Sequence, residues 1–203
     1  IKEVVTAGKL RATTDTAAAV GESEAVVVVV PLFVDESGVP DFAWMDSATR
    51  DIARGLKPGT LVSYETTLPV GTTRNRFAPM LEEVSNLKAG KDFNLVFSPE
   101  RVFTGRVFAD LRKYPKLVGG INDASTEAGV KFYEQVLEFD KRDDLARPNG
   151  VWNLGTPEAS EMAKLAETTY RDVNIGLANL SYLSELMALA CQILAVRFVA
   201  TSK

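Results

Sequence analysis

The chain contains no histidine and only one cysteine, Cys191, among its 203 residues. A Ser-His-Asp or Cys-His mechanism within the chain is therefore excluded, and a metal site is not expected. A single cysteine forms no internal disulfide, which favours a reducing, cytoplasmic setting. Any chemistry must use lysine, glutamate, aspartate or threonine side chains together with a borrowed cofactor.

Long runs of a single residue class are also absent. The net charge of -4 is spread along the chain without a long basic block, which argues against a nucleic-acid partner. The apolar run at 25–34 is too short to span a bilayer, and no secretion signal is visible, so no membrane partner is expected. An apolar content of 46% is ample for a buried core.

Strands and helices are predicted to alternate over the first 154 residues. Five consecutive valines at 26–30 predict a strand that is buried on both faces and ends at Pro31. Further strands are predicted at 60–64, 93–97, 116–118 and 151–154, with helices at 41–55, 72–88 and 123–137. This order implies a parallel sheet with right-handed crossovers, whose ligand-binding loops all leave one edge.

The pattern changes after residue 157, where one long helix or two stacked helices are predicted to about residue 196. The charged segment 141–150 is the predicted linker. One helical stripe, which includes Met162 and Val173, is expected to pack. A second stripe carries Glu161, Lys164, Thr168 and Arg171, and its two cations suit a phosphate or an oxyanion, although a solvated polar face is the alternative. Cys191 lies in an apolar helical context, which favours a buried thiol over a nucleophile.

Three unusual loops, at 31–35, 65–73 and 98–106, follow predicted strands. The second places four threonines around a proline and a glycine before a helix, and offers hydroxyls and free backbone N–H groups to phosphate or ribose oxygens. Helix capping is the alternative, and is favoured for Thr72 and Thr73. The third sets Glu100 beside two arginines, which suits a carboxylate near a bound anion or a surface salt bridge.

Seven segments in matching order resemble the UDP-glucose/GDP-mannose dehydrogenase family. They are residues 26–31, 40–41, 56–62, 65–73, 98–102, 116–120 and 158–175, and the resemblance extends from about residue 10 to 179. It implies an α/β fold: an incomplete Rossmann-like parallel sheet, the second part of an NAD-binding domain, in residues 1–150. A long-helix dimerisation domain would follow in residues 151–203, and the protein would be a homodimer.

The resemblance also implies an activity. An NAD-dependent enzyme would oxidise the C6 hydroxyl of a UDP-hexose through an aldehyde and an enzyme thioester to a carboxylate, using two NAD. Thr67 would help to place a water, Glu100 would act as general base and Lys164 would stabilise the oxyanion, while Thr168 stands where the family usually has asparagine. The implied NAD-binding residues are Pro31, Leu32, Thr66, Thr67 and Glu100. The implied substrate-binding residues are Arg101, Lys164 and Arg171, and Arg101 favours a UDP-N-acetylhexosamine.

The chain departs from the family pattern in several places. It contains neither the Gly-rich phosphate turn nor the Gly-Gly-His-Cys setting of the catalytic cysteine, and Leu32-Phe33 replaces the usual Thr-Pro pair. We therefore expect these residues to be an internal piece of a longer protein and to be inactive alone. Two alternatives stay open: a single-step NAD-dependent hydroxyacid or 6-phosphogluconate-type dehydrogenase, against which the Ser98–Arg101 loop argues, and a non-catalytic nucleotide-binding or dimerisation fragment.

Overall fold

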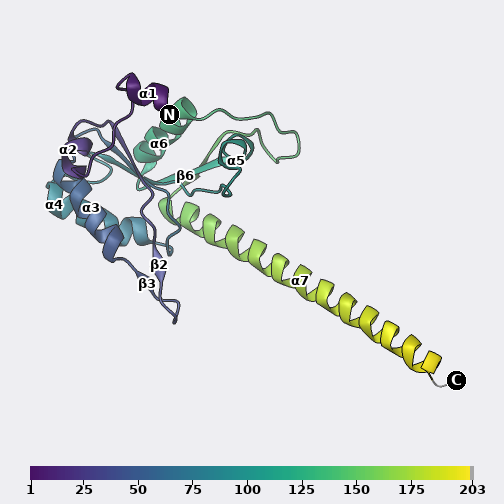
Figure 1. The fold of residues 1–203 in the computed structure, drawn as a ribbon. Helices are drawn as coiled ribbons and strands as arrows, with labels where there is room; N and C mark the ends of the chain where they lie inside the picture. Colours follow the sequence, from purple (N-terminus) through teal and green to yellow (C-terminus); the bar gives the residue numbers. More distant parts are fainter. Residues whose placement is uncertain (202–203) are drawn as a thin grey trace. The chain divides into compact units, whose positions relative to one another are not determined.

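The computed structural model describes the backbone of residues 1–201 and the side chains of residues 1–187, so the side chain of Cys191 lies outside the described residues. The chain forms two compact units, Ile1–Lys164 and Leu165–Lys203. The first unit is an α/β domain, and the second consists of the later part of helix α7 (Pro157–Thr201), as Figure 1 shows.

A five-stranded sheet forms the centre of the first unit. Its order is β1-β4-β5-β6-β7, and the strands are β1 (Ala25–Val28), β4 (Leu61–Tyr64), β5 (Asn94–Phe97), β6 (Lys116–Gly120) and β7 (Val151–Gly155). The pairs β1–β4, β4–β5 and β6–β7 are parallel, whereas β5 and β6 are antiparallel. A separate hairpin joins β2 (Phe33–Val34) to β3 (Pro40–Asp41).

Helices cover both faces of this sheet, and the alternation of side chains along the strands determines which helices each face contacts. One face packs Val62, Leu95 and Phe97 into a core with α2 (Thr16–Gly21), α3 (Ala43–Gly55) and α4 (Ala78–Ser85). The opposite face packs Val96 and Val118 against Tyr133 of α6 (Asp123–Val136). The remaining helices are α1 (Lys2–Thr6), the π-helical turn η1 (Thr73–Phe77) and α5 (Val107–Lys113). The first unit therefore has three layers, with the sheet between two layers of helices.

Strand β1 differs from its prediction. It ends at Val28 rather than Val30, and the expectation that it is buried on both faces is wrong, because Val27 is 41% and Val29 66% exposed. The cause is its position in the sheet: β1 is the first strand in the order and pairs only with β4 among the described residues.

The predicted all-parallel sheet is also wrong at one junction. Strand β6 runs antiparallel to β5, with Phe97 opposite Gly119 and Val96 opposite Gly120. The start of β6, rather than its end, therefore lies at the edge where β4 and β5 end. This reversal brings Lys116 to the candidate site.

Two predicted helices have different bounds. The helix predicted at 41–55 begins only at Ala43, since Pro40 and Asp41 form β3. The helix predicted at 72–88 consists of η1 followed by α4, and α4 ends where Asn86 adopts a left-handed backbone with φ 59°. The helix at 123–137 is confirmed as α6 to within one residue.

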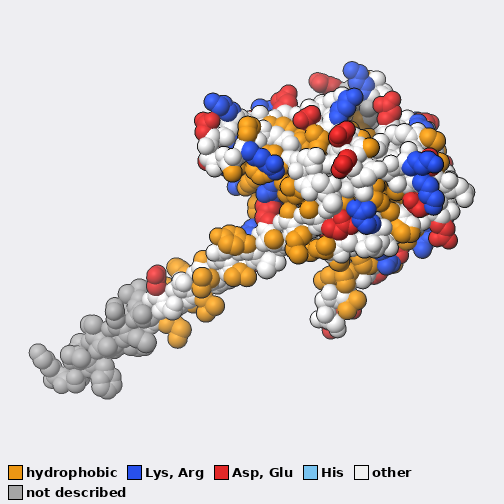
Figure 2. All heavy atoms as spheres, turned by 180° about the vertical axis from the view of Figure 1, so that it is seen from behind, with side chains coloured by type: hydrophobic (Ala, Val, Ile, Leu, Met, Phe, Trp, Pro, Cys, Tyr) orange, Lys and Arg blue, Asp and Glu red, His pale blue; other side chains and the backbone are white. Residues whose placement is uncertain are grey.

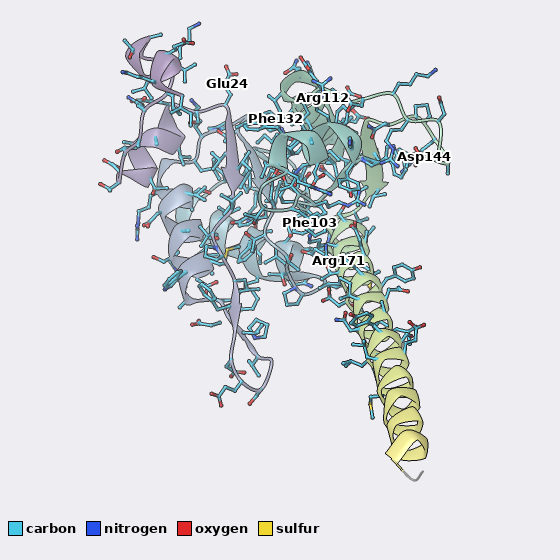
Figure 3. All side chains as sticks on the ribbon, turned by 45° about the vertical axis from the view of Figure 1, so that its right-hand side comes forward. Glu24, Phe103, Arg112, Phe132, Asp144 and Arg171 are labelled. Atoms are coloured by element: carbon cyan, nitrogen blue, oxygen red, sulfur yellow. The ribbon has the colours of Figure 1, made fainter. Side chains whose placement is uncertain are left out.

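The predicted linker at 141–150 is part of the first unit and contacts α5. Asp140, just before it, accepts a hydrogen bond at 2.9 Å from Nε of Arg112, and Asn149 donates to the backbone carbonyl of Arg112 at 2.9 Å. Figure 3 shows Arg112 on α5 and Asp144 on this segment. Strand β7 then completes the sheet, and a domain boundary at residue 150 stays a prediction.

The described residues contain neither a candidate membrane span nor a candidate metal cluster. No helix among them combines the length and the apolar composition of a transmembrane segment. Within the same part of the chain, no group of three or more acidic, cysteine or histidine side chains is arranged to hold a metal ion.

Candidate functional site

The candidate site lies where β1, β4 and β5 end and β6 begins. Ligands of open α/β sheets bind outside the carboxyl ends of the strands. The loop after β5 is joined to the end of β4 by a backbone hydrogen bond from Glu100 N–H to the Glu65 carbonyl at 3.1 Å. Continuation of the β5–β6 pairing places Glu100 opposite Lys116. Charged residues from three strand ends thus meet at one edge.

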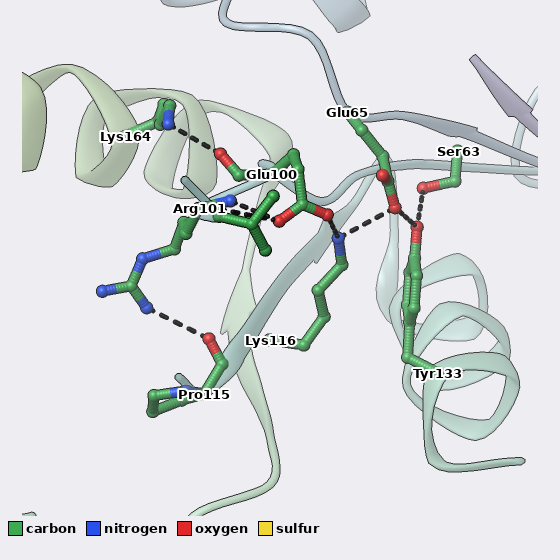
Figure 4. Close-up of polar contacts among 9 residues, drawn as sticks. Ser63, Glu65, Glu100, Arg101, Pro115, Lys116, Tyr133 and Lys164 are labelled. Atoms are coloured by element: carbon green, nitrogen blue, oxygen red, sulfur yellow. Dashed lines mark hydrogen bonds and ion pairs between the residues drawn. The ribbon is translucent and has the colours of Figure 1, made fainter. Parts of the chain in front are cut away.

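A buried ion-pair network joins these residues (Figure 4). Nζ of Lys116 lies 2.8 Å from Oε1 of Glu65 and 3.4 Å from Oε2 of Glu100. Lys116 is 5% and Glu65 8% exposed, whereas the Glu100 side chain is 34% exposed. We call these three residues the Glu65–Lys116–Glu100 cluster. Its net charge is -1, and its least buried group is the carboxylate of Glu100.

Tyr133 supports the inner end of the cluster from α6. Its hydroxyl donates to Oε1 of Glu65 at 2.6 Å and lies 2.7 Å from Oγ of Ser63, while its ring lies 4.8 Å from Nζ of Lys116. Burial raises the pKa of Tyr133 well above its usual value, and the negative charge of Glu65 adds to this effect. Tyr133 is therefore a neutral donor to Glu65 over the physiological pH range.

Both oxygens of Glu100 have defined partners. Oε1 accepts hydrogen bonds from the backbone N–H groups of Arg101 at 2.6 Å and Val102 at 3.1 Å, so the carboxylate closes its own turn. Oε2 faces Lys116. Lys164, in the first turns of α7, donates from Nζ to the backbone carbonyl of Glu100 at 2.6 Å. The two residues expected to act as base and oxyanion stabiliser are therefore neighbours.

Contacts with the start of β6 and with α5 hold the rest of the 98–106 loop in place. Arg101 donates from a guanidinium nitrogen to the carbonyl of Pro115 at 3.0 Å, which ties the loop to the start of β6. Asp110 of α5 is buried and accepts from Phe103 N–H and from Arg106, each at 3.1 Å. Figure 3 shows Phe103 on this loop. The loop therefore holds Glu100 in a defined position.

The residues expected to contact the cofactor lie on the loops after β1 and β4. The hydroxyl of Thr66 donates to the carbonyl of Val30 at 2.7 Å, which joins the two loops. Thr67 and Pro31 are exposed, and Leu32 packs partly against the main core. The structure thus brings Pro31, Leu32, Thr66 and Thr67 to the same edge.

The turn at 71–73 does not offer the N–H groups that were expected to bind phosphate. The fully buried carboxylate of Glu161 accepts from Gly71 N–H at 2.5 Å, from Thr73 N–H at 2.9 Å and from the Thr73 hydroxyl at 2.7 Å. The Thr72 hydroxyl donates to the Pro69 carbonyl at 2.6 Å, so side-chain capping by these threonines is wrong as well. A carboxylate from α7 fills the position expected for an anionic ligand.

A second acidic residue of α7 packs beside this turn. Arg74 donates to both carboxylate oxygens of Glu158, at 2.6 and 3.4 Å. Burial raises the pKa of Glu158, but the hydrogen bonds and positive charge of Arg74, a backbone hydrogen bond and the Thr156 hydroxyl together outweigh it, so the pKa lies below its ordinary value. Burial also raises the pKa of Glu161, while the hydrogen bonds from Thr73 and Gly71 oppose that shift. The start of α7 is therefore bound firmly to the first unit.

Thr168 and Arg171 lie in the second unit, Leu165–Lys203. Within that unit Nε of Arg171 lies 3.6 Å from a carboxylate oxygen of Asp172. The side chains of Thr168 and Arg171 are partly buried, and each has interaction partners. Their expected roles remain predictions.

The sequence did not predict the roles of four residues of the site. They are the ion pair of Glu65 and Lys116, the hydrogen bond from Tyr133 to Glu65, and the buried carboxylate of Glu161 that accepts from the turn at 71–73. A signal existed for Lys116, because a charged residue that opens the buried segment 116–120 requires a partner. The partner itself depends on the antiparallel reversal of β6, which local patterns do not show.

Comparison with known proteins identifies the family. A sequence model of the NAD binding domain of the UDP-glucose/GDP-mannose dehydrogenase family matches residues 1–137. The chain therefore belongs to this family, and its cofactor is NAD, as the resemblance implied.

Several similar proteins within this family carry names that specify a substrate. UDP-N-acetyl-D-mannosamine dehydrogenase of Pyrococcus horikoshii is 34% identical over 180 residues, and the enzyme of that name from Escherichia coli is 32% identical over 185; each match covers 88% of this chain. The chain spans 40% of the length of these curated relatives. The crystal structure of NDP-N-acetyl-D-galactosaminuronic acid dehydrogenase from Methanosarcina mazei matches with a TM-score of 0.74 and 37% identity, over 87% of this chain and 35% of that one.

Proposed function

We propose that the protein containing this chain is an NAD-dependent nucleotide-sugar 6-dehydrogenase that converts a UDP-N-acetylhexosamine to the corresponding uronic acid. The observation that carries the proposal is the hydrogen bond from Lys164 Nζ to the Glu100 carbonyl at 2.6 Å. It brings the Lys164 ammonium group to the backbone of the residue that carries the Glu100 carboxylate, at the sheet edge where nucleotide cofactors bind. Relatives named as dehydrogenases of N-acetylated nucleotide sugars support the substrate class.

The proposed reaction has two oxidations. The C6 alcohol first transfers a hydride and releases a proton to give an aldehyde, to which a cysteine thiol of the protein outside this chain adds. Loss of a second hydride from the carbon, with release of the hydroxyl proton to solvent, gives a thioester. Water then attacks the thioester carbonyl, the C–S bond breaks, the thiolate leaves and the carboxylate product forms. NAD, when bound, accepts the hydride in each oxidation.

This chain supplies four side chains to these steps. Glu100 takes the proton of the attacking water, because a carboxylate that is about one-third exposed is open to water while its orientation is fixed. Lys164 stabilises the oxyanion that forms at the thioester carbonyl, since an ammonium group neutralises developing charge without proton transfer. Thr67, exposed on the loop after β4, helps to place the water, and Thr168 donates a hydrogen bond to the intermediate.

Binding is assigned to the same loops. Pro31, Leu32, Thr66 and Thr67 lie at the carboxyl ends of parallel strands, which fits an extended dinucleotide, and Glu100 lies beside them on the next loop. Arg101 and Arg171 are proposed to bind the substrate together with Lys164, since guanidinium groups pair with phosphate oxygens.

Helix α7 is proposed to form a homodimer as part of a central helical domain in residues 151–203. The support is its apolar surface in the second unit, where Val173, Leu177 and Leu180 are more than 60% exposed. Figure 2 shows apolar side chains along the described part of this helix. Exposed apolar residues at such density are typical of protein interfaces.

Replacement of Glu100 by Gln in the full-length protein tests the proposal. Glutamine keeps the shape but does not take a proton, so turnover is expected to fall by about 100-fold or more while both hydride transfers continue. The thioester then accumulates, and intact-mass measurement detects the protein with a covalently attached uronyl nucleotide. Glu127→Gln, on the exposed face of α6, is the matched control. Wild-type turnover in Glu100→Gln contradicts the proposal.

A further inference from the structure

Lys116 is a buried cation that is shared by two carboxylates. A buried ammonium group requires charged or hydrogen-bonding partners, and Glu65 at 2.8 Å already provides a buried one. The second carboxylate, Glu100, approaches to 3.4 Å from a loop and retains more exposure than the other two residues. Neutralisation of Lys116 alone therefore does not account for the contact with Glu100.

The contacts of Glu100 differ on its two sides. Oε1 is bound by the N–H groups of Arg101 and Val102, which belong to the same short turn as Glu100 itself. Oε2 faces Lys116, which opens strand β6 of the central sheet. Other contacts anchor the backbone of this loop, and Lys116 connects the carboxylate itself to the central sheet.

Lys116 is itself held in place. Glu65 directly follows the fully buried strand β4, and its Oε1 also accepts a hydrogen bond at 2.6 Å from the Tyr133 hydroxyl, which lies 2.7 Å from Oγ of Ser63. Figure 4 shows this succession from Ser63 through Tyr133, Glu65 and Lys116 to Glu100. Two strands and a helix therefore determine where the ammonium group lies.

We propose that Lys116, held by Glu65 and Tyr133, is a positioning residue. It orients the Glu100 carboxylate to take the proton of the water that hydrolyses the thioester. This inference rests on the proposed function of Glu100. Lys116 does not touch the reacting atoms; it acts through Glu100. A shift of about 1 Å in such a group is sufficient to lower a rate by about 100-fold.

The test compares three variants of the full-length protein. Two are the single substitutions Lys116→Met and Lys116→Arg. The third combines Lys116→Met with Glu65→Gln and so removes both charges of the Lys116–Glu65 pair; we call it the charge-free double variant. The double variant matters because Lys116→Met alone leaves Glu65 buried without its partner. Glutamine at 65 still accepts the Tyr133 hydrogen bond. Lys88→Met, which removes an ammonium group from an exposed ion pair with Glu82, is the matched control.

We expect kcat of the charge-free double variant to fall by about 100-fold with KM for NAD unchanged, and the covalent adduct to accumulate. Lys116→Arg restores a cation and retains kcat within about tenfold of wild type. The most specific readout is non-additivity: in a Glu100→Gln background, loss of Lys116 causes no further decrease, because its effect passes through Glu100. A purely structural lysine gives additive losses.

Different outcomes overturn different statements. If Glu100→Gln traps the adduct but the charge-free double variant turns over at the wild-type rate, the positioning role is wrong and the proposed function stands. Additive losses in the Glu100→Gln background also overturn the positioning role. If Glu100→Gln turns over normally, the role of Glu100 fails, and that of Lys116 fails with it.

Discussion

The carboxylate of Glu161 accepts the backbone N–H of Thr73 at 2.9 Å and its hydroxyl at 2.7 Å, although the two residues are 88 positions apart. This contact joins the first turns of α7 to the turn that precedes η1. Lys164 lies one turn further along α7, where it donates to Glu100. Glu161 therefore determines the position from which Lys164 reaches the candidate site.

Glu161→Ala is expected to destabilise the protein. The substitution removes three accepted hydrogen bonds and leaves the buried N–H groups of Gly71 and Thr73 without their acceptor, at a cost of about 2–4 kcal/mol in the free energy of unfolding. Equilibrium urea unfolding measures the change. Glu127→Ala on the exposed side of α6 should alter stability by less than about 0.5 kcal/mol, and an equally small effect of Glu161→Ala would refute the capping role.

Stability is expected to fall above pH 10. Burial raises the pKa of Tyr64 and of Tyr133 well above the ordinary value of 10.0. The stability that each neutral side chain contributes is fully present below the unfolded-state pKa and is lost as the pH rises from there through the folded-state value. The free energy of unfolding should decrease by about 1.4 kcal/mol per pH unit for each such tyrosine.

Tyr64→Phe removes the contribution of Tyr64 to the pH dependence of the free energy of unfolding. Urea unfolding between pH 8 and 11 should give a shallower decrease than in the wild type, because one titrating group is gone. Thr49→Val is the control, since it removes the 2.8 Å contact between the Thr49 and Tyr64 hydroxyls but keeps the tyrosine. It should lower stability at every pH and keep a steep decrease above pH 10. An unchanged slope in Tyr64→Phe contradicts the assignment.

Gly119→Ala and Gly176→Ala are expected to have opposite effects. A Cβ at Gly119 would lie 1.9 Å from the Thr156 carbonyl oxygen, so β6 and the backbone before α7 must separate, at a cost of about 3 kcal/mol or more. A Cβ at Gly176 meets nothing within 4 Å, and alanine in this helix should add about 0.5–1 kcal/mol. Melting curves of both variants measure the difference, and equal stability of Gly119→Ala and the wild type would show that the close approach is absent.

Local patterns predicted most elements of the fold because each depends on residues close in sequence. The strands predicted at 60–64 and 93–97 and the helix predicted at 123–137 agree with β4, β5 and α6 to within one residue. The direction of β6 was not predictable in this way, since nothing within 116–120 distinguishes a parallel from an antiparallel strand. The exposure of Val27 and Val29 likewise follows from the place of β1 in the sheet.

The candidate site was predicted unevenly for the same reason. Glu100 and Lys164 came from the family resemblance, and the structure brings them together through a contact across 64 positions. Lys116 and Glu65 are joined across 51 positions, and no periodicity encodes such a pairing. The free N–H groups expected at 71–73 are occupied because Glu161, a distant residue, lies on them.

The ratio of NADH formed to sugar consumed by the full-length protein tests the central claim most directly. With UDP-N-acetylmannosamine or another UDP-N-acetylhexosamine and excess NAD, the proposed mechanism predicts two NADH per sugar and a uronic acid product. One NADH per sugar with an aldehyde or ketone product would contradict the thioester route and favour a single-step dehydrogenase. No NADH with any of these sugars would favour a non-catalytic module.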